Sequence, residues 1–539
     1  MSGATAVIVG AGAGGIAAAT QLARKGFQVQ VLDRHESVGG RCSLLYKDGF
    51  RFDQGPSLVL MPELFRRAFE DLGTSLKNEG VSMLRCEPNY CIWFADHDSI
   101  ELSRDMPRLK AEIERHEGAG GFYRFCAFMA AAGYQYEMSM QSVFNQSFPT
   151  MWSMMHLSLI KAVLALRPST SFYQQAATFF RSEKMRRVWS FTSMYLGMSP
   201  YRAPATYCML PYAEISDGIW YPEGGFQKVL QALGEVGTRL GVNYRLNTPV
   251  KKVQLSTDGL TATGVQLASG DVISADLVVV NADLVYACNR LLPPSSHARR
   301  LQDRSASCSS ISFYWSFGEE IPELKPHNVF LADKYRESFD TIFDEQGIPE
   351  DPSFYVNVPS RVDQSAAPTG KDAVMVLVPV GHLPKTTFTD VEEEKARWES
   401  LVARMRDTVI KTIEERTGTR GLRSKLLNEQ VNTPLTWRDR FNLDRGAILG
   451  LSHSFNNVGC FRPHIKHPHI RGLYFAGCST QPGAGVPACL VSGRLVSEQI
   501  VKDWKKRDEA QFFTSWKFLM GLAMLGLLMA VMASFPRRV

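Results

Sequence analysis

The sequence lacks several features that would identify a site directly. Its ten cysteines are scattered singly and form no C-x-x-C pair, which argues against a zinc site. It has no basic tract interleaved with aromatic residues, and its net charge is only +6 over 539 residues, so we expect no nucleic-acid partner. No internal repeat, catalytic triad or carboxylate pair is evident. The sequence therefore predicts no metal ion and leaves the catalytic residues unidentified.

A secretory leader is also missing from the sequence. The chain enters a glycine-rich motif at Gly10, without a basic segment and an apolar segment before it. We therefore expect the main body to face the cytosol, where cysteines are mostly small buried side chains in a reducing compartment. Hydrophobic residues make up 45% of the chain, which is enough for buried cores and argues against disorder.

The first 33 residues have the order of a strand–helix–strand unit. The apolar run at 5–9 is typical of a buried parallel strand. Residues 16–25 are predicted to form a helix that Gly26 ends, and residues 28–32 to form a second strand. This order matters because phosphate groups bind where such a helix begins.

The glycines between the first strand and the helix follow the spacing G-x-G-x-x-G. Gly10 permits a tight turn, Gly12 lets the backbone approach a pyrophosphate, and Gly15 lets the helix pack closely on the strand. Asp33 follows the second strand, where a carboxylate can accept a hydrogen bond from a ribose hydroxyl. Together these features predict a dinucleotide site rather than a merely tight packing unit.

The spacing does not distinguish NAD from FAD, but the following residues favour FAD. The stretch GGRC, residues 39–42, resembles the extended motif of FAD-containing oxidases of the amine-oxidase and carotenoid-desaturase superfamily. The resemblance places the cation of Arg41 over the phosphates of the flavin cofactor; the alternative is an ordinary glycine turn with a solvated arginine. FDQGPS, residues 52–57, resembles the loop that closes over the flavin in that group.

The C-terminal part of the sequence carries a second glycine-rich motif. A strand is predicted at 473–476, a loop of small residues at 477–485, and a helix from Pro487 to about Trp504. The positive dipole end of that helix is placed to stabilise the negative charge of a reduced flavin. Residues 472–493 closely resemble the C-terminal signature of the bacterial- and fungal-type phytoene desaturases, a family of carotenoid-forming flavoenzymes.

Internal segments of the chain also resemble the fungal branch of that family, from about residue 5 to residue 504. They are RFDQGPSLVL, NYCIWF, YPEGGFQKVLQAL, ADLVVVNADLVY and FNLDRGAILGLSHS. The resemblance implies FAD as cofactor, with Val250 touching the adenine through its backbone. The cofactor-binding residues that we predict are Gly10, Gly12, Gly14, Gly15, Asp33, Arg34, Gly39, Gly40, Arg41, Gly55, Pro56, Ser57, Val250, Gly477, Gly485 and Val486.

Four residues depart from the family pattern. Asp33 stands where Glu is more common, and the shorter acid can still accept from a ribose. Gln481 stands where His is common, and Cys478 and Cys489 also differ from the expected residues. These differences leave FAD binding as expected but leave open the substrate and the number of reaction steps.

The predicted fold class is α/β with an α+β substrate part: a Rossmann-like FAD-binding domain interleaved with a substrate domain. The substrate domain is expected to contain a mixed or antiparallel sheet with strands at 311–317 and 374–380, and a charged outer helix at 392–415. A further strand is predicted at 244–255. We expect FAD-binding parts at 1–105, 220–305 and 430–505, substrate parts at 106–219 and 306–429, and a C-terminal transmembrane helix at 512–535.

Two segments suggest contact with a lipid bilayer. Residues 518–535 are eighteen residues without charge, which span about 27 Å as a helix. We expect a C-terminal single-pass anchor with the body on the cytosolic side, because more cations precede the segment than follow it. A helix lying in the membrane interface and a packed terminal helix are the alternatives. Residues 151–166 are either a membrane-surface patch or a core helix of the substrate domain.

The resemblance implies that the chain desaturates phytoene, an apolar polyene, by hydride transfer to FAD. The electron acceptor (oxygen, a quinone or NAD(P)) and a homo-oligomeric state stay open. A polyene isomerase, a saturase or another terpenoid desaturase is the alternative, and a non-enzymatic escort of prenylated GTPases is a minor one. The candidates for the proton acceptor are Glu214, Asp217, Asp439, His453 and His464. None is assigned, because carboxylates and histidines such as these are more often ordinary surface side chains.

Overall fold

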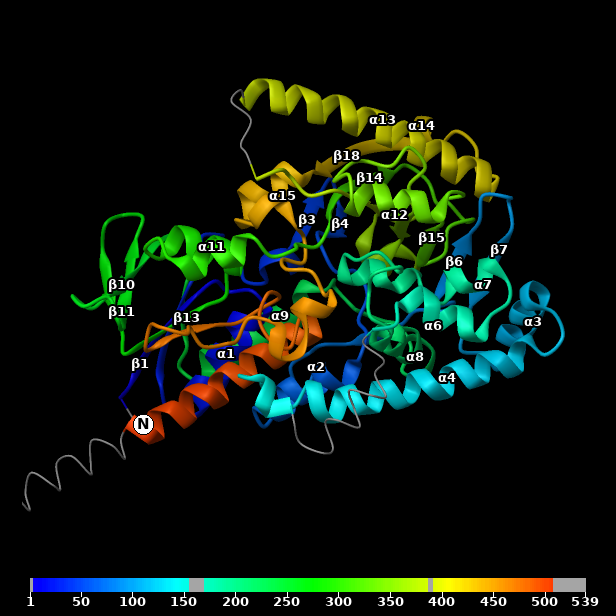
Figure 1. Ribbon diagram of the computed structural model, residues 1–539. Helices are drawn as coiled ribbons and strands as arrows, with labels where there is room; N and C mark the ends of the chain where they lie inside the picture. The colour runs from blue at the N-terminus through cyan, green and yellow to red at the C-terminus, as the bar shows by residue number, and fades with distance from the viewer. Residues whose placement is uncertain (1–2, 155–168, 386–390, 508–539) are drawn as a thin grey trace, which may run out of the picture.

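The computed structural model describes residues 3–154, 169–385 and 391–507 (Figure 1). A parallel five-stranded sheet with the order β19-β13-β1-β2-β9 brings together three distant parts of the chain. Parallel neighbours need long crossover connections, and the one between β13 and β19 includes residues 281–472. The strands are β1 (Thr5–Val9), β2 (Gln28–Leu32), β9 (Asn243–Arg245), β13 (Leu277–Val280) and β19 (Leu473–Phe475).

Side chains of β1 alternate between two hydrophobic cores, because successive residues of a strand point to opposite faces. Ala6 and Ile8 share a core with residues of α1, whereas Val7 and Val9 share one with a three-stranded antiparallel sheet. Both faces of the sheet are therefore covered, as expected for parallel strands. The covering elements are α1 (Ala13–Arg24), β10 (Val250–Leu255), β11 (Ala262–Leu267) and β12 (Val272–Ser274).

The C-terminal helix of the described chain, residues 486–507, packs against α1 and crosses in front of it in Figure 1. A Cβ on Gly493 would lie 2.5 Å from the Gly14 carbonyl oxygen and 2.7 Å from the Ala17 Cβ. Glycine at 493 thus allows the first and last helices to approach closely. On the same core, α9 (Gln227–Arg239) packs beside α1.

A seven-stranded mixed sheet forms the other main layer, with the order β18-β14-β17-β16-β15-β6-β7. Its neighbours are antiparallel except for β15 and β6, which are parallel. β6 and β7 precede residue 105 in the chain and still pair in this sheet; the domain boundaries stay predictions. The strands are β6 (Tyr90–Trp93), β7 (Ser99–Leu102), β14 (Ser309–Phe317), β15 (His327–Phe330), β16 (Phe354–Asn357), β17 (Asp372–Val380) and β18 (Leu426–Asn432).

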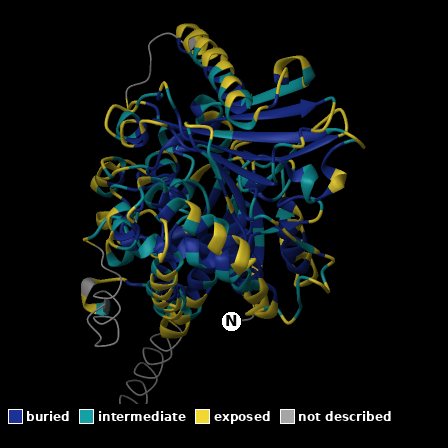
Figure 2. Ribbon diagram, turned by 90° about the vertical axis from the view of Figure 1, so that its right-hand side faces the viewer, coloured by how far each residue is buried: buried dark blue, intermediate teal, exposed yellow. Residues whose placement is uncertain are grey.

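One face of the seven-stranded sheet lies under the long helix α13 (Val391–Thr417), drawn in yellow at the top of Figure 1. Phe313 and Trp315 share a core there with Val409 and Ile413 of the helix. The charged helix predicted at 392–415 is confirmed, with one buried side besides its solvated face. In Figure 2 the sheets are dark blue, and exposed residues gather on the helices and loops around them.

The remaining elements surround these two sheets (Figure 1). The short strands pair as β3–β4 and β5–β8. They are β3 (Leu44–Lys47), β4 (Phe50–Asp53), β5 (Met83–Arg85) and β8 (Trp220–Pro222), with helices α2 (Pro62–Glu70), α3 (Met106–Glu117), α4 (Gly121–Met138), α6 (Phe172–Phe179), α7 (Glu183–Val188), α8 (Met209–Ser216), α10 (Leu284–Tyr286), α11 (Ser296–Gln302), α12 (Tyr335–Phe343), α14 (Leu422–Lys425) and α15 (Pro434–Phe441).

The predicted strands at 5–9, 28–32, 311–317 and 374–380 are all confirmed, but the one at 244–255 is wrong in its extent. It divides into β9 and β10, which belong to different sheets. Asn247 has a φ of 51°, a left-handed conformation that a continuous strand does not contain. The turn lets the chain leave the parallel sheet and start the antiparallel one.

The predictions of a C-terminal transmembrane helix and of a single-pass membrane anchor are corrected. Within residues 3–154, 169–385 and 391–507, no helix is long and apolar enough to cross a bilayer. The helix at 486–507 carries charged residues along its last turns, including Asp503 and Lys505, which a bilayer core disfavours. The segments 512–535 and 155–166 lie outside the described residues.

Candidate cofactor and substrate site

A cavity of about 880 Å³ takes its lining from both main sheets. The five-stranded sheet contributes Val9, Leu32, Asn281 and Ala476, which lie at or just after the carboxyl ends of their strands. Ligands of open parallel sheets bind at this edge. The seven-stranded sheet contributes Ser310, Ser312, Tyr355, Met375, Leu377 and Pro379.

The first glycine motif forms one wall of this cavity. Gly10 has a φ of 101°, and a Cβ there would lie 2.8 Å from the Asn281 carbonyl oxygen. Gly12 is the residue before α1 and has no side chain to cap the helix, so the first N–H groups stay open to an anion. Gly15 does not line the cavity; it lies beneath the turn, where a Cβ would be 2.0 Å from the Gly10 carbonyl oxygen.

Asn281 was missed in the sequence, although it directly follows the apolar run of the segment ADLVVVNADLVY. Its side-chain amide donates a hydrogen bond of 3.3 Å to the Gly10 carbonyl oxygen. Its side chain also lies within 3.0 Å of the positions that Cβ atoms on Gly12 and Gly14 would take. Asn281 therefore buttresses the glycine turn from the neighbouring strand.

Asp33 lies where the sequence predicted it, at the cavity and next to the end of β2. Its carboxylate is 7% exposed and accepts hydrogen bonds from the Ala11 N–H at 2.7 Å and the His35 N–H at 2.8 Å. Arg34 also lines the cavity, and its guanidinium donates to the Asn442 side chain at 2.8 Å. The contacts hold Asp33 at the turn; a ribose contact stays a prediction.

Arg41 links the second glycine pair to the C-terminal motif. Its guanidinium donates to the Ile448 carbonyl oxygen and, at 3.1 Å, to the Cys478 Sγ. The Sγ atoms of Cys478 and Cys489 are 3.4 Å apart. The hydrogen bond from Cys489 and the charge of Arg41 hold the pKa of Cys478 well below its usual value, although burial opposes them, and the pKa of Cys489 is raised by the same hydrogen bond and by burial. Two departures from the family pattern thus form one contact at the cavity.

The remaining predicted cofactor residues converge on the same cavity from four loops. Gly55 fits against Arg41, because a Cβ on it would be 2.5 Å from the Arg41 carbonyl oxygen. The Ser57 hydroxyl lies 2.9 Å from the Tyr355 hydroxyl, so this loop touches the seven-stranded sheet. Those that line the cavity, besides the ones already described, are Gly14, Gly39, Gly40, Pro56, Val250, Gly477, Gly485 and Val486.

The departure at Gln481 fixes part of the cavity wall. Its side-chain oxygen accepts from the Ser147 hydroxyl at 2.9 Å and the Phe148 N–H at 2.8 Å, and its amide donates to the Phe148 carbonyl at 2.8 Å. Phe148 lines the cavity. Gln481 thus holds an apolar side chain against the cavity without reaching it.

The rest of the cavity wall is largely apolar. It is continuous with the glycine-lined part, so a cofactor there and an apolar molecule beside it would share one space. The apolar lining includes Leu60, Met61, Phe148, Met194, Leu196, Met209, Leu210, Met375 and Leu377.

The five candidate proton acceptors lie in different surroundings. Glu214 is 2% exposed and does not line the cavity, but it accepts from the hydroxyl of Tyr90, to which the cavity-lining Tyr195 donates. Asp217 accepts from the Tyr136 hydroxyl at 2.8 Å, and Asp439 pairs with Arg438 at the surface. Of these five, His453 alone lines the cavity; burial holds its pKa well below 6.5, and its Nε2 accepts from the Ala484 N–H. His464 bonds to Ser147.

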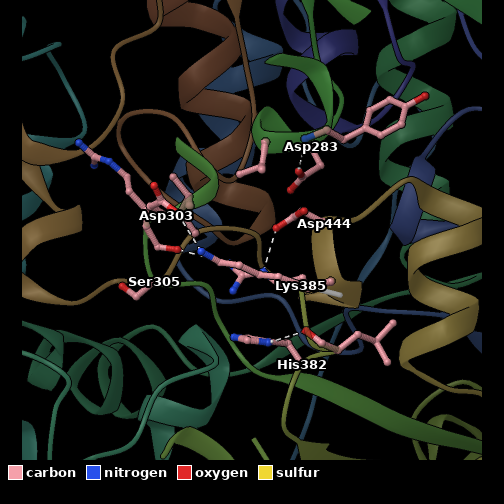
Figure 3. Close-up of polar contacts among 12 residues, drawn as sticks. Asp283, Asp303, Ser305, His382, Lys385 and Asp444 are labelled. Carbon is pink, nitrogen blue, oxygen red and sulfur yellow. Dashed lines mark hydrogen bonds and ion pairs between the residues drawn. The ribbon is translucent and has the colours of Figure 1, made fainter. Parts of the chain in front are cut away.

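Asp283 is a further cavity residue that the sequence did not identify. It accepts from the Tyr286 N–H at 2.9 Å, and burial raises its pKa to about 6, helped by the nearby charge of Asp444 (Figure 3). Beside it, Lys385 pairs with Asp303 at 2.8 Å. These contacts tie the loop after β17 to the segments around the cavity.

Comparisons with known proteins agree with this geometry. Residues 13–501 match the flavin containing amine oxidoreductase family. The chain is 49% identical to a phytoene desaturase of Fusarium fujikuroi, over 92% of this chain and 89% of the relative. It is 50% identical to one of Neurospora crassa (93% and 85% covered) and 38% identical to a zeta-carotene-forming phytoene desaturase of Myxococcus xanthus (92% and 93%).

Solved structures share the fold at low sequence identity. An oxidoreductase from Methanosarcina mazei has a TM-score of 0.59 and 17% identity, covering 92% of this chain and all of that one. Putrescine oxidase bound to putrescine has a TM-score of 0.60 and 15% identity, covering 93% and 99%. The chain belongs to the flavin-containing amine oxidoreductase family and, within it, to the group of the fungal phytoene desaturases.

Proposed function

We propose that this protein is an FAD-dependent phytoene desaturase, which introduces successive double bonds into a C40 isoprenoid during carotenoid biosynthesis. The observation that carries the proposal is 49% identity to a phytoene desaturase over 89% of that relative's length. The cavity supports it, because a glycine-lined part and an apolar part are continuous. The product, lycopene or a more desaturated carotene, is the finer part of the proposal.

The residues present fit FAD at the glycine-lined part of the cavity. Gly10, Gly12 and Gly14 line the cavity without side chains, so a ligand can approach their backbone atoms closely. The open start of α1 suits the pyrophosphate, and Arg41 adds a cation from the other side of the turn. Asp33, whose carboxylate is held by the Ala11 N–H, is the proposed partner of the ribose.

FAD, when bound, supplies the acceptor for the hydride that leaves the substrate. The chain itself aligns an apolar substrate along the wall of Met375, Leu377 and Leu210 and keeps water out. A polyene offers no polar group for recognition, so shape and apolar contact must position it. The start of the helix at 486–507 stabilises negative charge nearby through its dipole.

The proposed partners are the polyene and the surface of a lipid bilayer that stores it. Exposed aromatic side chains support this at the mouth of the cavity, where the short helix at 151–154 contacts residues 459–461. Trp152 is 78% exposed, and Phe455 and Phe461 are partly exposed and line the cavity. Assembly into a homo-oligomer and the choice of oxygen, a quinone or NAD(P) as electron acceptor belong to the same proposal.

The test uses the purified FAD-containing protein with phytoene in liposomes and a quinone. We expect visible absorbance of conjugated carotenes to rise in step with loss of phytoene. A protein that retains FAD but forms no coloured product from phytoene would contradict the proposal and favour the alternative of an isomerase, a saturase or a desaturase of another terpenoid.

A further inference from the structure

A chain of three hydrogen-bonding groups leads from the cavity wall into the protein. The hydroxyl of Tyr195, which lines the cavity, donates to the hydroxyl of Tyr90. The Tyr90 hydroxyl in turn donates to the Glu214 Oε1 at 3.2 Å. The three residues come from separate elements: residues 191–196, β6 and α8. Their directions agree, so each group can pass a proton to the next.

The end of this chain is buried and held in place. Tyr90 is 0% and Glu214 2% exposed. The Asn89 side chain donates to the Glu214 carbonyl oxygen, and the ring of Phe191 packs edge-on against the ring of Tyr90. Burying an ionised carboxyl group in such a place costs free energy unless the group is hydrogen-bonded or becomes neutral. A buried ionisable group bonded towards a cavity is a candidate functional group.

The cavity end of the chain lies near the loop expected over the flavin. Tyr355 lines the cavity, and its hydroxyl bonds to the Ser57 hydroxyl at 2.9 Å and to the His327 Nδ1 at 2.6 Å. An ionised Tyr355 would raise the pKa of Tyr195. Ser57 belongs to the predicted cofactor residues. These bonds link the Ser57 loop to His327, whose ring centroid lies 5.9 Å from that of Tyr90.

We propose that Tyr195, Tyr90 and Glu214 form a relay that receives the proton lost from the substrate, an inference that rests on the proposed desaturase function. In each step one carbon loses a hydride to FAD and its neighbour loses a proton. The electron pair of the second C–H bond becomes the new π bond. Without an acceptor for this proton, an apolar cavity would have nowhere to place the charge.

The proton balance of the relay closes in one concerted shift. The substrate proton goes to the hydroxyl oxygen of Tyr195, the proton of Tyr195 goes to Tyr90, and the proton of Tyr90 goes to the ionised carboxylate of Glu214. Both phenols keep their net protonation, and Glu214 becomes neutral. Glu214 returns its proton to solvent before the next step, while the electron acceptor, a quinone or oxygen, reoxidises the flavin.

The relay predicts a dependence on pH. Burial raises the pKa of Glu214 to about 8, opposed by the hydrogen bonds from Tyr90 and Tyr195. The other titratable groups that face this region are Tyr355 and His327. Burial raises the pKa of Tyr355 and lowers the pKa of His327 to about 3, so both stay neutral. Behind α8, the Arg104 guanidinium bonds to the Ile215 and Ser216 carbonyls, and Asp217 accepts from Tyr136. The rate should therefore rise with pH up to about 8, as the carboxylate ionises, and level off above.

The first experiment measures flavin reduction by phytoene in a single turnover, with holoprotein in liposomes under anaerobic conditions. Tyr195→Phe removes only the hydroxyl of the relay residue that lines the cavity, and we expect reduction to slow by about 100-fold. Tyr136→Phe is the matched control, because it removes a phenol bonded to a neighbouring carboxylate that does not lead to the cavity. A Tyr195→Phe protein as fast as wild type would overturn the relay.

The second experiment follows the same rate against pH in Glu214→Gln and Glu214→Asp. We expect the Gln variant to be slow with no rise towards pH 8, and the Asp variant to recover rate and pH dependence. A Glu214→Gln protein with the same rate of flavin reduction and the same pH profile as the wild type would contradict the relay. If the Gln variant binds no FAD, Tyr195→Phe decides, because it removes one hydroxyl and leaves the tyrosine ring's carbon atoms and the Glu214 carboxyl in place.

The two proposals fail in distinguishable ways. Wild-type protein that retains FAD but is not reduced by phytoene counts against the desaturase function itself. Wild-type protein that is reduced, with unchanged variants, counts against the relay alone.

Discussion

Gly15 lies so close to Gly10 that a Cβ on Gly15 would be 2.0 Å from the Gly10 carbonyl oxygen. The contact joins α1 to the turn after β1, and side chains of any size are excluded from it. The third glycine of the motif therefore acts on the packing of the cofactor turn rather than as a lining residue.

Replacing Gly15 by alanine should open this contact. We expect a loss of about 3 kcal/mol in the free energy of unfolding, because the clash is with backbone, and a marked loss of bound FAD. Urea denaturation and flavin absorbance measure the two effects. Gly234→Ala is the control, since its Cβ would meet no atom closer than 3.9 Å and alanine favours a helix. Equal stability of the two variants would contradict this packing role.

Cys478 should be the most reactive thiol of the FAD-free protein. Its thiolate is favoured by the Cys489 thiol and by Arg41, and both cysteines line the cavity. Alkylation by iodoacetamide, mapped by mass spectrometry, should be fastest at Cys478 and slowed by added FAD. Arg41→Gln should slow it as well. Faster labelling of the exposed Cys126 than of Cys478 would count against the predicted thiolate.

Leu377→Trp should shorten the space available to the substrate. Leu377 lies on β17 and lines the apolar part of the cavity, between Met375 and Pro379 on the same face. A larger ring there should lower the rate of the later steps by about tenfold and shift products to fewer conjugated bonds. Val378→Ile is the control, because Val378 faces α13. Chromatography of the carotenes checks this, and an unchanged product distribution would contradict it.

Glu214→Gln should change how stability depends on pH. The pKa of Glu214 is about 8 in the folded protein and near its ordinary value of 4.5 when unfolded. Between these values the folded chain binds the extra proton, so the free energy of unfolding falls as pH rises. The variant lacks this titrating carboxyl group. Its free energy of unfolding should therefore fall less than that of the wild type between about pH 5 and pH 8, by a few kcal/mol.

Denaturation by urea at both pH values measures this difference. Glu183→Gln, at an exposed helix start, is the control, and its free energy of unfolding should fall with pH as much as that of the wild type. A Glu214→Gln protein with the wild-type pH dependence would show that the buried carboxyl does not titrate as described.

Local sequence order was enough to predict the parts of the fold that short-range rules govern. The βαβ unit at 5–32 follows from an apolar strand, spaced glycines and an amphipathic helix, and α1 begins only three residues before the predicted start. All of the predicted cofactor residues except Gly15 line the cavity, because the glycine motifs lie at or next to the ends of strands and helices. The C-terminal helix was predicted for 487–504 and is described over 486–507.

Contacts between distant residues could not be predicted in this way. Asn281 reaches Gly10 across 271 positions, and Tyr90 meets Glu214 across 124. The division of the strand predicted at 244–255 depends on which sheet each half joins. The membrane anchor, predicted from apolarity alone, is also corrected, since no helix within the part of the chain that the structure describes could cross a bilayer.

The sequence by itself determined the dinucleotide motif, the family resemblance and the residues that meet at the cofactor cavity, because these depend on spacing along the chain. Only the tertiary structure decided which titratable groups are buried, which thiols touch and which tyrosines line the cavity. Desolvation and hydrogen bonding set those properties, and both arise only when segments far apart in the sequence pack together.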